Sequence, residues 1–178
     1  LALIQERREN PGEVDLTSYL LEHEIDGELL SDDEMSRMLF LTLIAGIDTT
    51  WSAIGFSLHH LASHPEDRAR LRDDPSLVPS AVEEFLRAYS PVWVARVTGE
   101  DAEVNGCPVR EGDWTVLAYP SANRDPALFE RADEVLIDRQ ENRHAAFGLG
   151  VHRCLGSNLA RMEMVIAIEM LSLIHISE

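Results

Sequence analysis

The chain has 178 residues, 45% of them hydrophobic, and a formal net charge of −17 because 32 acidic residues face only 15 basic ones. This hydrophobic content is enough to bury a sizeable core, so a disordered chain is not expected. The negative charge argues against a nucleic-acid partner, because contacts to phosphate need clustered positive charge. The only cysteines, Cys107 and Cys154, lie far apart, which indicates no disulfide framework and fits a reducing, cytoplasmic compartment.

A long helix dominates the first half of the chain. Ser31 and Glu34 have the spacing of a capping box, and the apolar pattern continues to about His64, where Pro65 ends it. The apolar run inside this helix is broken by Asp48, so no uninterrupted stretch reaches the roughly 18 residues of a membrane span, and no membrane association is expected. Shorter helices are expected over residues 1–10, 15–24, 65–74 and 76–90.

The second half predicts strands, turns and one last helix. Residues 95–119 alternate apolar and polar side chains around Asn105-Gly106 and Glu111-Gly112, which is typical of β-hairpins. Residues 120–144 are rich in charge and turn-forming residues. A helix then follows the second cysteine and continues to about Ile168.

Three glycines, Gly148, Gly150 and Gly156, surround Cys154 in the stretch "AAFGLGVHRCLGSNLA". Glycine is entropically costly unless the backbone needs a positive φ or a close approach, so this pattern predicts a loop wrapped tightly around the thiol. The N-terminus of the following helix would favour the thiolate form.

Several kinds of site could use such a cysteine. Zinc would need further ligands, and the nearest are His144 and His152, with no second cysteine close by. His60 and His64 are spaced i, i+4 on a helix, but nothing supplies their remaining ligands. A nucleophilic cysteine would need a base and an oxyanion site that the sequence does not reveal. A single thiolate held by glycine amides suits an iron that needs an electron-donating axial ligand.

Two further patterns lie on predicted helices. In "AGIDTT", Asp48 and Thr49 interrupt an apolar stretch, which indicates either a helix bend or a local opening where an acid and a hydroxyl form a proton relay beside a small ligand. In "VEEFLR", Glu84 and Arg87 are spaced i, i+3 and can pair, with Glu83 as the competing partner.

Taken in order, "AGIDTT", "EEFLR", "ARVTGED", "ANRDP" and "FGLGVHRCLGSNLARMEM" resemble the C-terminal half of a soluble bacterial cytochrome P450, a haem-thiolate monooxygenase. The resemblance extends from Leu1 to about Ile168. It implies a mainly α fold with small β-hairpins, in which a long helix and the cysteine loop enclose haem b. Residues 1–178 would then form one incomplete haem-binding domain.

The resemblance also implies roles for individual residues. Cys154 would be the axial ligand, and Asp48 and Thr49 would be the acid and alcohol that supply protons for oxygen activation. Glu84 and Arg87 would form a buried structural pair. The residues implied to contact haem are Arg96, Phe147, Gly148, Gly150, His152 and Gly156, with Arg96 and His152 at the propionates. Those implied to line the substrate pocket are Leu41, Ala45, Val92, Trp93, Val94 and Ala95.

One position departs from the family pattern. Where the family often has Pro-Glu-Arg-Phe, this chain has Ala132-Asp133-Glu134-Val135, which leaves the third partner of the buried pair in doubt and makes Arg139 the candidate.

The activity implied by the resemblance is insertion of one oxygen atom from O₂ into a small apolar substrate, with electrons from NAD(P)H through a ferredoxin. An acidic ferredoxin would dock on the side of the cysteine loop, at Arg143, Arg153 and Arg161. The alternatives are a peroxide-driven peroxygenase on the same fold, a haem-binding sensor or carrier without turnover, and a helical domain without cofactor.

The two ends of the chain carry their own expectations. The first residue is not Met, which predicts a fragment that is inactive alone. Residues 171–178, ending in "LSLIHISE", depart from the resemblance and predict a foreign tail.

Overall fold

The computed structural model describes residues 1–12 and 14–172. The described residues form two compact units, divided between Asp48 and Thr49. The boundary falls inside one long helix, α3, so the two units are described in turn. The tail expected over residues 171–178 lies, from residue 173 on, outside the described residues. The elements of the first unit are α1 (Ala2–Glu9), α2 (Leu16–Leu21), β1 (Glu24–Ile25), β2 (Glu28–Leu29) and the start of α3 (Asp32–Ser63).

The first unit is held by a small core in which Ile4, Leu20, Leu30 and Met35 are buried. β1 and β2 form a short antiparallel pair around Asp26 and Gly27, which both have positive φ. This two-residue hairpin was not expected from the sequence, because its strands are too short for a visible alternation.

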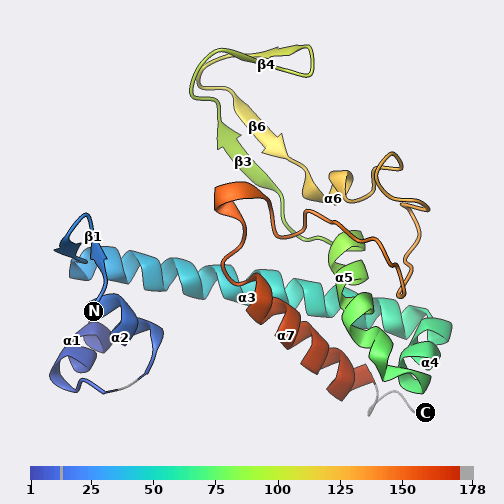
Figure 1. Cartoon of the computed structure of the whole chain (residues 1–178), viewed down its shortest axis with the longest axis horizontal. Helices are drawn as coiled ribbons and strands as arrows, with labels where there is room; N and C mark the ends of the chain where they lie inside the picture. Colours follow the sequence, from blue (N-terminus) through green and yellow to red (C-terminus); the bar gives the residue numbers. More distant parts are fainter. Residues whose placement is uncertain (13, 173–178) are drawn as a thin grey trace. The chain divides into compact units, whose positions relative to one another are not determined.

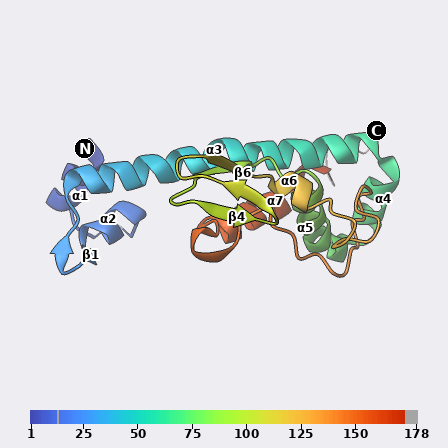
Figure 2. The same cartoon turned by 90° about the horizontal axis from the view of Figure 1, so that it is seen from above.

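α3 begins and ends as the sequence predicts. The Ser31 amide donates to Glu34 Oε2 at 2.9 Å, and the Glu34 amide donates to Ser31 Oγ at 3.3 Å, which is the reciprocal pattern of a capping box. The helix then continues to Ser63, two residues before Pro65. Figure 2 shows α3 as one uninterrupted helix.

α3 is also long and apolar enough to cross a membrane, by length and composition alone. Requiring an unbroken run of apolar residues was therefore too strict a criterion for a membrane-spanning helix. One charged residue, Asp48, lowers the mean hydropathy of an 18-residue stretch only moderately. The core helix of a soluble protein meets the same criterion, so this property does not identify a membrane protein.

The second unit contains the rest of α3 and a larger core. Its buried side chains come from α3, α4, α5 and α7 and from the irregular chain between them, with Leu61, Leu71, Phe85, Ile137 and Met164 at its centre. The remaining elements are α4 (Pro65–Asp73), η1 (Pro75–Leu77), α5 (Val78–Ala88), β3 (Val94–Val97), β4 (Ala102–Val104), β5 (Cys107–Val109), β6 (Trp114–Leu117), α6 (Tyr119–Ala122), η2 (Gly150–His152), α7 (Ser157–Ala167) and η3 (Ile168–Ser172).

The strands of the second unit pair differently from two consecutive hairpins. β4 and β5 join at Asn105-Gly106, both with positive φ, as the sequence predicts. The expected hairpin at Glu111-Gly112 is wrong, because β6 pairs antiparallel with β3 and not with β5. In the sequence, the β4–β5 hairpin therefore lies between β3 and β6, and it extends from the end of the pair that these two strands form (Figure 1).

Between α6 and α7 the chain has no long helix or strand, as expected for residues 120–144. This irregular segment packs beside α5, and α5 packs in turn against α7 (Figure 1). α5 buries eight of its eleven residues, charged Glu84 and Arg87 among them. It is thus the element on which the polar networks of this unit converge.

Candidate functional site

The loop that carries Cys154 is closed by a backbone hydrogen bond. The Cys154 amide donates to the Phe147 carbonyl at 2.8 Å, and the Ser157 amide donates to the Cys154 carbonyl where α7 begins. Gly148 and Gly150 both have φ of +69°, as the predicted tight loop requires. At Gly148 a Cβ would also lie 3.2 Å from the Tyr119 hydroxyl, so glycine is needed there for space as well.

The thiol itself is exposed and lies just before the N-terminus of α7. The first amides of a helix have no intrahelical acceptors, so the N-terminus of α7 carries partial positive charge beside Cys154. Gly156 differs from the other two glycines, because its φ is −80° and a Cβ there would make only ordinary contact with Cys154 Sγ at 4.0 Å.

The surroundings of the thiol fit a large apolar cofactor. Leu149, Val151 and Leu155 flank Cys154 in the chain and are 72%, 97% and 97% exposed. Exposing three neighbouring aliphatic side chains to water is unfavourable in free energy, so an apolar surface of a bound partner or cofactor would be expected to cover them. Within residues 1–12 and 14–172 no set of three metal-ligating side chains gathers.

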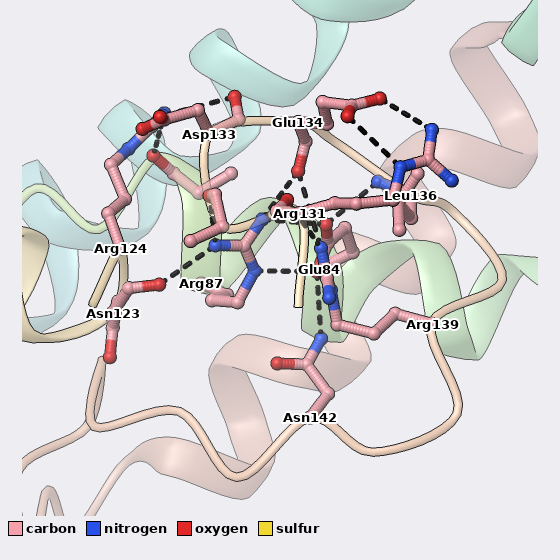
Figure 3. A network of polar contacts seen from close by, with 12 residues as sticks. Glu84, Arg87, Asn123, Arg124, Arg131, Asp133, Glu134, Leu136, Arg139 and Asn142 are labelled. Atoms are coloured by element: carbon pink, nitrogen blue, oxygen red, sulfur yellow. Dashed lines mark hydrogen bonds and ion pairs between the residues drawn. The ribbon is translucent and has the colours of Figure 1, made fainter. Parts of the chain in front are cut away.

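Glu84 and Arg87 form the predicted buried pair, with both side chains fully buried. Arg87 Nε and Nη2 donate to the two Glu84 carboxylate oxygens at 2.8 Å each. Its remaining donors bind carbonyls of the irregular segment, those of Asn123, Ala132 and Glu134, at 2.7–2.8 Å (Figure 3). The pair therefore fixes α5 to that segment.

Arg139 is the third partner of this pair, as the sequence analysis proposed. Its Nε donates to Glu84 Oε2 at 2.9 Å, and the Leu136 amide donates to Glu84 Oε1 at 2.8 Å. Burial raises the pKa of Glu84, but the hydrogen bonds from Arg87, the Leu136 amide and Arg139 outweigh it and lower the pKa below its ordinary value. The carboxylate is therefore kept ionised inside the fold.

Glu83 is not a competing partner of Arg87 but the centre of a second network. Arg161 Nε and Nη2 donate to its two oxygens at 2.5 and 3.0 Å, and His144 Nε2 is 3.0 Å from Oε2. Burial raises the pKa of Glu83, but the hydrogen bonds from His144 and Arg161 lower it to about 2. This network could not be predicted from the sequence, because its members are 61 and 78 residues from Glu83.

Asp48 and Thr49 are consecutive, exposed residues of α3. The helix passes through this segment as regular α-helix, so the local opening considered for "AGIDTT" is not found there. An isolated glycine costs a helix only about 1 kcal/mol, too little to interrupt one of this length. The proton relay at these two residues stays a prediction.

The predicted pocket and haem contacts fall on three elements. Leu41 and Ala45 lie on α3 with exposed side chains, whereas Val92, Trp93, Val94 and Ala95 lead into and begin β3. Arg96 follows on β3, exposed, with Nη1 on the Ala95 carbonyl. His152 is exposed in the turn η2. These assignments also stay predictions.

The predicted docking arginines differ in their surroundings. Arg143 and Arg153 are exposed, and among the described residues neither has an ion-pair partner. Arg161 is engaged with Glu83 and its guanidinium lies 4.6 Å from the centre of the Phe147 ring. Its charge is therefore compensated within the chain.

His60 belongs to a third buried network that the sequence analysis missed. Its Nδ1 is 2.7 Å from the Tyr89 hydroxyl and its Nε2 is 2.9 Å from Asp67 Oδ2, so both ring nitrogens are occupied within the fold. Its ring stacks on that of His64 at 4.0 Å. This histidine joins α3 to α4 and α5, which explains its burial without a metal.

Comparison with known proteins gives one consistent result. The family model "Cytochrome P450" matches residues 2–172. A probable cytochrome P450 127A1 from Sinorhizobium fredii is 41% identical over 91% of this chain and 39% of its own length. The vitamin D(3) 25-hydroxylase of Pseudonocardia autotrophica is likewise 41% identical, over 93% of this chain and 42% of its own length.

Solved structures agree. The crystal structure of CYP109E1 from Bacillus megaterium in complex with corticosterone superposes with a TM-score of 0.90 at 38% identity, covering 96% of this chain and 46% of that one. The chain thus spans about two fifths of the length of the curated relatives that it matches.

Proposed function

The chain belongs to the cytochrome P450 family, and we propose that it forms the haem-binding part of a haem-thiolate monooxygenase, with Cys154 as the axial ligand of haem b. The observation that carries the proposal is the exposed thiol of Cys154 in its glycine loop at the N-terminus of α7. Haem-thiolate chemistry inserts one atom of O₂ into a C–H bond and releases the other as water, using two protons and the two electrons of NAD(P)H.

The chain's own residues would support this chemistry in distinct ways. Cys154 would bind the iron through its sulfur beside the partial positive charge at the start of α7, and Leu149, Val151 and Leu155 would exclude water once they are covered by the cofactor. Arg96 binds a carboxylate of the cofactor, and so does His152.

Two side chains of α3 would handle protons. Thr49 holds a proton at Oγ1, and Asp48 replaces it from solvent at its carboxylate. General acid–base assistance of this kind contributes typically about 10²–10⁴-fold to a rate.

The substrate is proposed to be a small apolar organic molecule. Trp93, Val92 and Val94 offer apolar surface beside Arg96. Two relatives point to the same class, one named as a vitamin D(3) hydroxylase and one solved with corticosterone.

Electrons are proposed to arrive from a ferredoxin that docks at Arg143 and Arg153, the exposed arginines of the cysteine-loop region. Because such steering is screened over a Debye length of about 8 Å at physiological ionic strength, reduction should slow as salt increases. Arg161 is left out of this proposal, because Glu83 compensates its charge.

The axial-ligand assignment is tested by Cys154→Ser in the full-length, haem-loaded protein. The wild type should give the strongly red-shifted Soret band of a thiolate-bound ferrous–CO complex, and the variant should lose it. A variant that keeps this band would overturn the assignment. Substrate-dependent consumption of NAD(P)H with a surrogate ferredoxin system separates a monooxygenase from a haem carrier, which would show none.

The 178-residue chain alone is proposed to be inactive, since it spans only about two fifths of its curated relatives. Large apolar side chains such as Phe40, Leu43 and Trp51 are 65%, 60% and 73% exposed, which fits surface that the rest of a longer protein covers. Haem binding and turnover by the purified, monomeric 178-residue chain would refute this.

A further inference from the structure

A single carboxylate holds both ends of the loop that carries Cys154. Glu83, on α5, accepts a two-pronged pair of hydrogen bonds from Arg161, which lies on α7 after the loop. The same carboxylate is hydrogen-bonded to His144, which lies before the loop, at 3.0 Å. The thiol thus sits on a segment whose two ends meet at one side chain of a third element.

A short path leads from Glu83 to the backbone of Cys154. The Arg161 guanidinium that Glu83 orients lies over the Phe147 ring, with 4.6 Å from Cζ to the ring centre. The Phe147 carbonyl accepts the Cys154 amide hydrogen at 2.8 Å. A guanidinium stacked on an aromatic face contributes both cation–π attraction and packing, so fixing Arg161 also fixes the residue that closes the loop.

The histidine contact has a defined direction. The Ala146 amide donates to His144 Nδ1 at 3.2 Å, so Nδ1 is the acceptor and Nε2 carries the proton that His144 donates to Glu83. The His144 side chain is only 3% exposed. It is therefore held in one orientation at the point where the chain enters the loop.

We propose that Glu83 is a positioning residue for the Cys154 thiolate, which it acts on through His144, Arg161 and Phe147. The proposal rests on the assignment of Cys154 as axial ligand. Glu83 is distinct from its neighbour Glu84, which accepts hydrogen bonds from Arg87, Arg139 and Asn142 and, among the described residues, none from residues 144–161. With Glu83 altered, Arg161 is no longer held over the Phe147 ring, and the hydrogen bond between the Phe147 carbonyl and the Cys154 amide is less firmly fixed.

The test is Glu83→Gln in the full-length, haem-loaded protein. Glutamine keeps one accepting oxygen but cannot accept the two-pronged bond from Arg161 as an ion pair. Hydrogen bonds to charged groups are strong enough that losing one should change the ratio of thiolate-bound to thiol-bound ferrous–CO complex by about ten-fold, in favour of the thiol form. The haem reduction potential should shift as well, while the far-UV circular dichroism stays that of the wild type.

The matched control is Glu134→Gln. Glu134 also accepts two hydrogen bonds from one arginine, Arg131, but the pair is exposed and its side chains make no contact with the cysteine loop among the described residues. This control should leave both the Soret ratio and the potential unchanged. Equal effects of Glu83→Gln and Glu134→Gln would overturn the proposal.

A second arm separates positioning from electrostatic docking. If Arg161 served mainly to attract a ferredoxin, Glu83→Gln would free its charge and speed reduction by the ferredoxin without altering the Soret band, and this result would overturn the proposal. The proposal predicts an altered Soret ratio that persists when dithionite replaces the ferredoxin. If Glu83→Gln does not fold, Arg161→Lys tests the same link, because it keeps the charge and loses the planar fork.

The outcome for Cys154→Ser keeps the two proposals distinguishable. Loss of the thiolate band in Cys154→Ser together with a wild-type spectrum in Glu83→Gln refutes the positioning role alone. Retention of the band in Cys154→Ser refutes the axial-ligand assignment. In the protein without haem, amide hydrogen exchange at Cys154 should be faster in Glu83→Gln than in the wild type, and equal exchange rates would count against the link.

Discussion

Replacement of Arg87 by lysine keeps the positive charge but removes the geometry of the buried network. Arg87 uses all five of its N–H donors, two on Glu84 and three on the carbonyls of Asn123, Ala132 and Glu134. Lysine has three donors at a single nitrogen, so at least two of these five acceptors lose their partner.

The expected cost follows from that count. Hydrogen bonds to charged groups contribute about 1.5–3 kcal/mol each, so two lost bonds destabilise the fold by about 3 kcal/mol or more. This is a large share of the roughly 5–15 kcal/mol by which a domain is stable. With an m-value of about 3 kcal/mol per molar urea, the unfolding midpoint should fall by about 1 M.

The measurement is urea unfolding of the full-length, haem-loaded protein, followed by far-UV circular dichroism. Arg37→Lys is the control, because Arg37 forms an exposed i, i+4 pair with Asp33, and such pairs contribute about 0–1 kcal/mol. If Arg87→Lys lowers the urea midpoint no more than Arg37→Lys does, the hydrogen bonds of Arg87 contribute no more to stability than an exposed ion pair.

Three further outcomes are expected. Because the pKa of Glu83 is lowered from 4.5 to about 2, its stabilising effect is complete above about pH 4.5 and is lost as the pH falls toward 2. The free energy of unfolding should fall by at most about 3 kcal/mol over this range, and by less because the side chain is 31% exposed to solvent. In Glu83→Gln the free energy of unfolding should depend less on pH between 4.5 and 2 than in the wild type. The same pH dependence in both proteins would contradict this prediction. Thr49→Ala and Asp48→Asn should keep their haem but form product about 10²–10⁴-fold more slowly, with NAD(P)H consumed to make peroxide. If both variants form as much product per NAD(P)H as the wild type, Asp48 and Thr49 have no role in proton transfer. His60→Leu leaves the Tyr89 hydroxyl without its partner and Asp67 with only its longer ion pair to Arg70, and should cost about 2–4 kcal/mol in thermal unfolding. A midpoint within error of the wild type would show that water replaces the imidazole.

Several patterns that depend on neighbours along the chain were predicted correctly, although the hairpin expected at Glu111-Gly112 was not found. The capping box at Ser31 and Glu34, the end of α3 before Pro65 and the turn at Asn105-Gly106 all appear as expected. Each is decided within a few residues by local hydrogen bonds or backbone preference, so the sequence alone is sufficient.

Contacts between residues that are far apart in the sequence were not predicted. Glu83 and Glu84 are chemically identical neighbours on α5, and only the folded chain shows that one binds Arg87 and the other Arg161. The pairing of β3 with β6 across an inserted hairpin was missed for the same reason. Arg139 could be named in advance only because a resemblance to a known family supplied the expected third partner.

The irregular segment between α6 and α7 shows why such contacts cannot be predicted from the sequence. A segment without helices or strands still has to satisfy its backbone carbonyls, and here arginine side chains do much of this work. Arg87 donates to three carbonyls, Arg124 to the carbonyls of Ala88 and Asp133, and Arg139 to the carbonyls of Glu130, Arg131 and Glu134.

A guanidinium can serve in this way because it offers a rigid fork of donors, and it stays in the interior only if a carboxylate compensates its charge. Glu84 supplies that carboxylate for Arg87 and Arg139. On the same helix, Glu83 supplies it for Arg161 beside the cysteine loop. Two adjacent carboxylates of α5 thus anchor two different irregular segments, and this is the physical reason to expect that altering Glu84 unfolds the domain, whereas altering Glu83 first disturbs the thiolate.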